Sequence, residues 1–161
     1  EIAELAKKFL KDPITVRIES RATAENVEQN VINVRKKDQK VDILHDLLLK
    51  EDFQKVLIFC RTKRGAERLS KTLLESGFKS DSIHGDKSQS QRERALRRFE
   101  ENALQVLVAT DVAARGLAID DVTHVINFDV PETYEDYIHR IGRTGRGGKT
   151  GNALTFIEEE K

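Results

Sequence analysis

A repeated alternation of short strand-like segments with amphipathic ones constrains the fold of this chain more than any other feature. Five short segments have the composition or position of strands: 56–60, 79–84, 106–109, 125–128 and 153–157. Three intervening segments have helical spacing or helix-start signals: 62–76, 88–99 and the residues after Pro131. Ser88–Gln91 fit a capping box at the start of the second, and Pro131 is expected to open the third. The alternation predicts an α/β fold with a single parallel sheet, helices on both faces and right-handed crossovers.

Length and composition set outer limits on the class of protein. With 161 residues, the chain holds about one domain, and it contains no run of 18 apolar residues that could cross a membrane. Lys plus Arg and Asp plus Glu both number 28, so the net charge is zero. The single cysteine, Cys60, cannot form an internal disulfide, which favours a reducing, cytoplasmic setting. The four histidines lack metal-ligand spacing, so we expect no metal site in this chain.

The first 25 residues differ from the rest. A short helical pattern ends at Pro13, an alternating extended segment follows, and residues 21–26 are polar. We therefore expect residues 1–25 to be the end of a preceding domain followed by a linker. Residues 26–161 are expected to form the single α/β domain.

Polar turns follow three of the predicted strands. Thr62 comes after the first of them, Gly85 after the second, and Thr110 with Asp111 after the third. In parallel sheets, ligands bind beyond the carboxyl ends of the strands, and a helix N-terminus there offers N–H groups to phosphate oxygens. Each of these residues is also an ordinary cap or turn residue, so only their shared edge favours phosphate binding.

A basic segment follows the first turn. Residues 61–98 contain 11 basic and 5 acidic residues, a local charge of +6 within a neutral chain. Gln91 and Arg94 are three residues apart and share a helix face, where one side chain can support the fold while the other contacts a phosphate. A solvated helix face is the alternative explanation of the charge, and a phosphate-binding surface is the functional one.

Three arginines recur at intervals of three between residues 139 and 146, separated by glycines: Arg140, Arg143 and Arg146. No acid lies between Asp136 and Glu158, so an anion would relieve the repulsion among the guanidinium groups. Such a cluster suits phosphoryl transfer, and a loop held by carbonyls and acids is the alternative. A P-loop is excluded at residues 148–150, because its first glycine would fall at Arg143.

Taken together, these segments resemble motifs of the DEAD-box ATP-dependent RNA helicases, specifically their C-terminal RecA-like domain, with the bacterial RhlE-type branch as the nearest. Residues 56–63 resemble motif IV, Gln91–Arg94 the Q-x-x-R element, residues 109–116 motif V and residues 139–146 motif VI. The resemblance covers nearly the whole chain. It implies a RecA-like fold and a role as the second domain of an enzyme that hydrolyses ATP and unwinds RNA duplexes locally.

The resemblance also implies a role for individual residues. Arg143 and Arg146 would be catalytic and reach the γ-phosphate of ATP, and Arg115 would couple nucleotide state to domain closure. The RNA backbone would be held by Thr62, Gly85, Arg94 and Thr110, with support from Gln91 and Asp111. His139 and Arg140 would organise the interdomain face. ATP and Mg²⁺ would be held mainly by an N-terminal RecA-like domain, and the partners would be RNA and that domain, with no membrane.

The chain departs from the family at one position and lacks other family elements. Ala118 stands where the family usually has an Asp that contacts the ATP ribose, so either this contact is weakened, Asp120 or Asp121 replaces it, or the residue was engineered. No Walker A or Asp-Glu-Ala-Asp sequence is present, so the chain alone is expected to lack ATPase activity. The alternative function is a non-catalytic RecA-like module that binds RNA or a protein.

Overall fold

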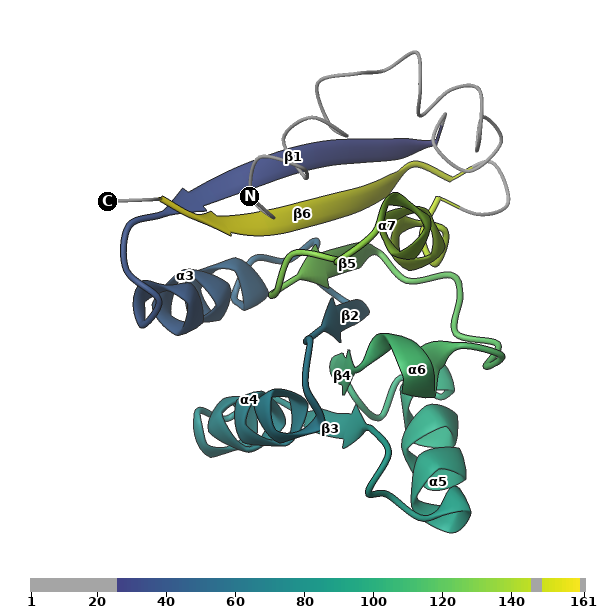
Figure 1. The fold of residues 1–161 in the computed structure, drawn as a ribbon. Helices are drawn as coiled ribbons and strands as arrows, with labels where there is room; N and C mark the ends of the chain where they lie inside the picture. The colour runs from purple at the N-terminus through teal and green to yellow at the C-terminus, as the bar shows by residue number, and fades with distance from the viewer. Residues whose placement is uncertain (1–25, 146–148, 160–161) are drawn as a thin grey trace.

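The computed structural model describes residues 26–145 and 149–159, which form a fully parallel sheet in the order β1-β6-β5-β2-β4-β3 (Figure 1). The strands are β1 (Val27–Val34), β2 (Val56–Phe59), β3 (Ser80–Ile83), β4 (Val106–Ala109), β5 (His124–Asn127) and β6 (Gly151–Glu158). The helices are α3 (Gln39–Leu48), α4 (Lys63–Glu75), α5 (Gln89–Glu100), α6 (Asp111–Ala114) and α7 (Tyr134–Ile141). The predicted α/β fold is confirmed.

The central strands are the ones with the most apolar sequences. Every residue of β2, β4 and β5 is buried, because helices cover both faces of the sheet at its centre. The outer strand β1 pairs with β6, and of its residues only Val27 and Val34, at its two ends, are buried. Neither β1 nor α3 was predicted. For β1, the polar residues of an edge strand hide the apolar signal.

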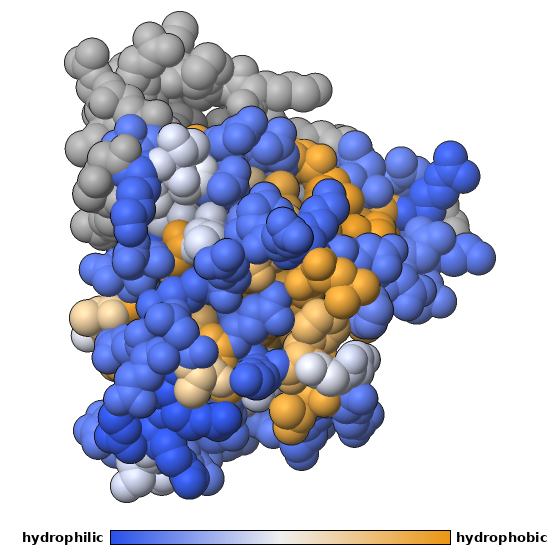
Figure 2. All heavy atoms as spheres, turned by 180° about the vertical axis from the view of Figure 1, so that it is seen from behind, coloured by the Kyte–Doolittle hydropathy of each residue, from blue (hydrophilic) through white to orange (hydrophobic). Residues whose placement is uncertain are grey.

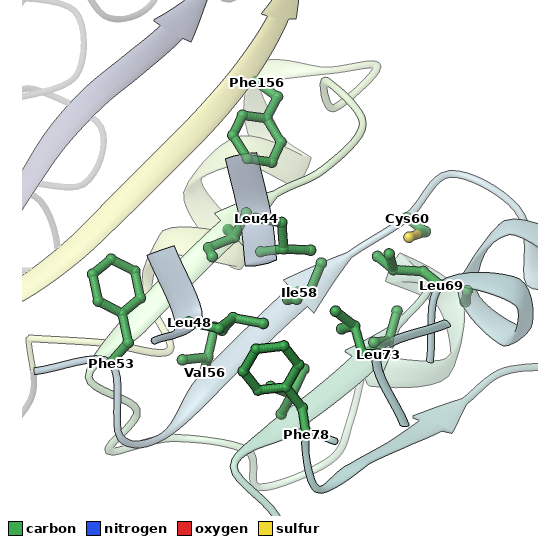
Figure 3. Close-up of a cluster of buried hydrophobic side chains, with 14 of the residues drawn as sticks. Leu44, Leu48, Phe53, Val56, Ile58, Cys60, Leu69, Leu73, Phe78 and Phe156 are labelled. Carbon is green, nitrogen blue, oxygen red and sulfur yellow. The ribbon is translucent and has the colours of Figure 1, made fainter. Parts of the chain in front are cut away.

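Alternate side chains of the central strands point to opposite faces of the sheet and pack into two separate apolar layers. On one face, Val56 and Ile58 of β2 pack with Leu44 of α3 and Leu69 and Leu73 of α4 (Figure 3). On the other face, side chains of β2 and β4 pack with α5 and α6, and α7 covers β1 and β6. Figure 1 shows α3 and α4 on one side of the sheet and α5, α6 and α7 on the other. The core therefore holds all the central strands rigidly from both sides.

Side-chain caps fix where the helices begin. Ser88 and Gln91 form the predicted capping box at the start of α5, with both reciprocal bonds present. The prediction that Pro131 opens the next helix was wrong by three residues. Thr133 is the N-cap of α7, and its hydroxyl accepts a hydrogen bond from the Asp136 amide at 3.0 Å. Pro131 instead lies buried in the turn that leads to this cap.

Figure 2 shows that hydrophilic side chains cover most of the face opposite to the view of Figure 1, with apolar ones gathered toward one side. Among the described residues, no helix combines the length and apolarity needed to cross a membrane. The same part of the chain contains no group of three or more His, Cys, Asp or Glu side chains arranged to hold a metal ion.

Candidate functional site

Three polar turns lie side by side at the carboxyl edge of the sheet. β2, β4 and β3 are consecutive strands, and their register aligns the ends of all three. The turns that contain Thr62, Thr110 and Gly85 follow these strands directly. Because parallel strands present their carboxyl ends together, residues from three separate parts of the sequence share one surface, as the sequence predicted.

Thr62 and Thr110 occupy equivalent positions at the starts of α4 and α6. Thr62 is exposed, and its Oγ1 accepts a hydrogen bond from the Gly65 amide at 3.0 Å. Thr110 is 9% exposed and is the N-cap of α6 without a side-chain cap bond. Beside Thr62 opens a hollow of about 610 Å³ between the N-terminal turns of α3 and α4. Of the two threonines, Thr62 is therefore the one that is open to solvent.

Gly85 lies in a turn that needs no glycine for its own folding. The Lys87 amide donates to the His84 carbonyl at 3.1 Å and closes the turn. A Cβ at position 85 would meet no atom within 4 Å, and the backbone there does not adopt a positive φ. The residue is exposed. The absence of a side chain therefore leaves an open approach to the backbone from outside the domain.

Gln91 and Arg94 divide their roles on α5. The Gln91 Oε1 atom accepts a hydrogen bond from the Ser88 amide at 2.8 Å and completes the cap of the helix. Arg94 is exposed, and its guanidinium forms no ion pair with the residues that the structure describes. Gln91 is therefore committed to the fold, while Arg94 presents a charge to solvent on the same helix.

Arg140 is the most buried charged residue of the site. Its side chain is 2% exposed and forms two hydrogen bonds with Asp111, Nε to Oδ1 at 2.7 Å and Nη2 to Oδ2 at 2.8 Å. Nη1 donates to Asn127 Oδ1 at 3.1 Å and to the Asp129 carbonyl at 2.7 Å, and the guanidinium lies over the Phe59 ring. Each nitrogen of the Arg140 guanidinium thus donates to a residue of this same domain, and the expected role of Arg140 in organising an interdomain face stays a prediction.

Arg143 lies close to the residues that follow α6. Its Nη1 donates to the Leu117 carbonyl at 2.9 Å, and Nη2 approaches the Ala114 carbonyl at 3.5 Å. The side chain is half-buried. These contacts match the alternative in which carbonyls hold the arginine segment, and they link residues 114–119 to the end of α7. Arg146 lies outside the described residues.

A small hollow brings Arg143 together with Arg115, the residue to which the resemblance assigns nucleotide coupling. Its lining includes Arg115, Asp136, His139 and Arg143. Arg115 is 64% exposed in its side chain, and Nη2 lies 3.3 Å from Asp136 Oδ1. His139 is also exposed. The predicted arginines at positions 115 and 143 thus meet at one surface although 28 residues separate them in the sequence.

Asp129 joins the turns after β2 and β5, and sequence reasoning missed it. Its Oδ2 accepts a hydrogen bond from the Arg61 amide at 2.8 Å, and Oδ1 lies 3.5 Å from the buried Lys40 Nζ. Burial raises the pKa of the neighbouring Cys60 thiol, and Asp129 adds to the effect, so the thiol stays protonated. The position of Asp129 just after a predicted strand could have identified it. Lys40 carries no comparable signal.

Ala118 lies exposed in the segment between α6 and β5. Of the two acids considered as replacements, Asp120 is exposed, and Asp121 forms an ion pair with Lys149 at 3.4 Å. Asp121 adopts a positive φ of 59°. Its carboxylate is therefore already engaged in a contact with Lys149, two residues before β6.

Comparison with known proteins identifies a matching family and similar sequences. A model of the helicase conserved C-terminal domain matches residues 39–148. The DEAD-box ATP-dependent RNA helicase CshA is 46% identical in Geobacillus kaustophilus and 47% identical in Bacillus subtilis, in each case over 97% of this chain. The alignments cover 33% and 32% of those relatives, so the chain spans about a third of their length. The RhlE-type branch stays a prediction.

Solved structures agree with the fold over most of the chain. The E. coli DEAD-box protein SrmB, bound to the regulator of ribonuclease activity A, superposes with a TM-score of 0.78 and 37% identity, covering 82% of this chain and 78% of that one. The C-terminal domain of the DEAD-box protein Dbp5 gives 0.76 and 33%, covering 84% and 78%. Dbp5 of S. cerevisiae bound to RNA and ADP BeF3 gives 0.76 and 32%, covering 85% and 37%.

Proposed function

The chain belongs to the DEAD-box ATP-dependent RNA helicases, as their conserved C-terminal helicase domain, and on this basis we propose that it works as the second RecA-like domain of an ATP-hydrolysing RNA helicase. Residues 1–25 would lead from an N-terminal RecA-like domain into this one. ATP and Mg²⁺ would be held mainly by that N-terminal domain. RNA and ATP would bind across the two domains and draw them together, and hydrolysis would let them separate.

One observation carries the proposal: the Arg140–Asp111 pair joins the two halves of the site. Asp111 directly follows Thr110 at the sheet edge, and Arg140 lies three residues before Arg143. A shift of the arginine segment on nucleotide binding would therefore be transmitted to the turn at Thr110 through a buried, two-point contact. The fixed geometry of a bidentate arginine–carboxylate pair supports such a coupling.

On the RNA side, Thr62, Gly85, Arg94 and Thr110 would contact the sugar–phosphate backbone of one strand. Gln91 and Asp111 would hold these contacts in place from within the fold, through the capping box and the Arg140 pair respectively. Phosphate contacts carry no base information, so the domain would bind RNA with little sequence preference. The exposed Gly85 backbone and the exposed Arg94 support this arrangement.

On the nucleotide side, Arg143 and Arg146 would stabilise the charge that develops on the γ-phosphate. Arg143 would exchange its carbonyl partners in residues 114–119 for phosphate oxygens on domain closure, a change that favours the charged acceptor. Arg115 would follow the same closure and leave Asp136. His139, exposed beside them, would face the neighbouring domain.

Complementation tests the proposal. This chain, mixed with the matching N-terminal RecA-like domain, is expected to restore ATP hydrolysis that depends on added RNA, while either part alone has essentially none. Covalent joining of the two parts serves as the positive control. If the joined protein binds RNA but never turns over ATP, the chain is instead a non-catalytic RecA-like binding module.

A further inference from the structure

The imidazole of His84 is enclosed between α4 and the Gly85 turn. The residue is 5% exposed, and its Nε2 lies 2.8 Å from Glu67 Oε1. Its Nδ1 lies 3.3 Å from the Asp86 amide nitrogen, which donates to it. We propose that Glu67 and His84 are positioning residues that hold the Gly85 turn in the conformation that contacts an RNA phosphate. This inference rests on the proposed function of the sheet edge.

The two contacts fix which nitrogen of His84 carries the proton. A backbone amide can only donate, so Nδ1 must accept from Asp86, and the ring proton is on Nε2, which donates to Glu67. The carboxylate of Glu67 is therefore required as an acceptor. The hydrogen bond from His84, followed by that from Ser82, lowers the pKa of Glu67 to about 2, so the acceptor is ionised at neutral pH.

The contact between Nδ1 and the Asp86 amide is an Asx-type turn built with an imidazole. In such turns a side chain accepts a hydrogen bond from the amide two residues on and fixes the backbone between them. Here the residue between is Gly85. The Asp86 amide is occupied by His84 and the Lys87 amide by the His84 carbonyl. Within the part of the chain that the structure describes, the Gly85 amide forms no hydrogen bond.

The turn therefore presents one free N–H donor beside an open backbone. Gly85 is exposed, and a Cβ at position 85 would meet nothing within 4 Å, so the backbone beside this donor is open to a ligand. A phosphate oxygen accepts from such a donor only when the turn is held in one orientation, and the chain of contacts from Glu67 through His84 supplies that restraint. Glu67 is itself anchored by Ser82 of β3, whose hydroxyl donates to it at 2.9 Å.

Electrostatics alone predicts the opposite effect for Glu67. It is one of 5 acids among 11 basic residues in the segment 61–98, and an acid near a phosphate-binding surface weakens RNA binding by repulsion. Removing Glu67 should therefore strengthen binding if its charge is all that matters. A positioning role predicts weaker binding instead, so the sign of the change separates the two explanations.

The test measures the affinity of the two-domain protein for a single-stranded oligoribonucleotide at one salt concentration. Glu67→Ala is expected to weaken binding roughly fivefold, the loss of one ordinary hydrogen bond. Glu67→Gln keeps an acceptor oxygen and removes the charge, so it should bind as well as the unchanged protein or better. Glu75→Ala is the matched control, because it removes an exposed acid from the end of the same helix.

A second pair of variants keeps the proposal testable if Glu67→Ala does not fold. His84→Ala removes the acceptor for the Asp86 amide and should weaken RNA binding, whereas His84→Asn replaces it with an amide oxygen in Asx geometry and should restore most of the affinity. Equal affinity of His84→Ala and the unchanged protein would overturn the proposal, as would tighter binding by Glu67→Ala.

Arg94→Ala separates this proposal from the function on which it depends. Weaker binding by Arg94→Ala together with unchanged binding by Glu67→Ala and His84→Ala would leave the RNA edge in place and refute the positioning role. If Arg94→Ala and Gly85→Ala both bind RNA normally, the RNA edge itself is wrong.

Discussion

The guanidinium of Arg140 binds the carboxylate of Asp111 through two hydrogen bonds of 2.7 and 2.8 Å, and this pair connects α7 to the start of α6. Arg140 is 2% exposed, while Asp111 keeps 26% of its side-chain surface. The pair is thus a largely buried contact that links the segment containing Thr110 to the segment containing Arg143. Stability, RNA binding and ATP turnover should each respond to this arrangement in a different way.

Loss of Arg140 should destabilise the domain strongly. Arg140→Ala leaves the Asp111 carboxylate and the Asn127 side chain without their partner, and breaking such a buried pair costs about 3–5 kcal/mol. Arg115→Ala is the control, because its ion pair with Asp136 is 64% exposed at the arginine and contributes about 0–1 kcal/mol. Urea denaturation measures both free energies of unfolding. Equal losses in the two variants would show that burial of Arg140 contributes nothing.

A methyl group at Gly85 should separate RNA binding from stability. Gly85→Ala meets no atom and needs no positive φ, so the free energy of unfolding should stay constant or rise by about 0.4–1 kcal/mol. RNA affinity should fall, because the methyl group occupies the approach to the backbone. In Gly77→Ala, by contrast, a φ of +96° should cost about 1–2 kcal/mol of stability and leave RNA affinity unchanged. Normal RNA affinity in Gly85→Ala would contradict the assignment.

Acidification should destabilise the domain through His124. This residue is 4% exposed and stacked on Phe53, and burial lowers its pKa from 6.5, with Asp52 opposing the shift more weakly. The unfolded chain therefore binds a proton more readily than the folded one, so the free energy of unfolding decreases as the pH falls below about 6.5. Denaturation curves between about pH 7 and pH 5 measure it. His124→Phe should show a smaller decrease, and an identical decrease would contradict this origin.

Apolar patterning and the geometry of parallel sheets predicted most of the fold and the edge on which Thr62, Gly85 and Thr110 meet. The capping box of Ser88 and Gln91 was also predicted, because its signal is local. The burial of Arg140 was not, since a spacing of three does not show which arginine points inward. That choice depends on Phe59 of β2 and on Asp129 in the segment after β5, neither of which belongs to the helix of Arg140. Edge strand β1 escaped prediction because solvent tolerates its polar residues.

Restoring an acid at position 118 should strengthen ATP binding in the two-domain protein. Ala118→Asp would supply an acceptor for a ribose hydroxyl, and a hydrogen bond to a charged group is expected to tighten binding by about 1–2 kcal/mol. Ala118 is exposed, so the change should not disturb the fold. Ala103→Asp is a matched control at another exposed alanine. Titration with ATP measures the affinity of each protein. Equal affinities of both variants and the parent would refute a contact between position 118 and the ribose.

The turnover of ATP by Arg143→Ala tests the central claim most directly. In the two-domain protein with saturating RNA and ATP, loss of this side chain should lower kcat on the order of 10³–10⁵-fold, the effect of an arginine that stabilises phosphoryl transfer. RNA affinity without nucleotide should stay unchanged, and thermal melting should verify that the domain remains folded. A folded Arg143→Ala protein whose kcat stays within about tenfold of the parent, far below that range, would show that Arg143 only holds the residues after α6.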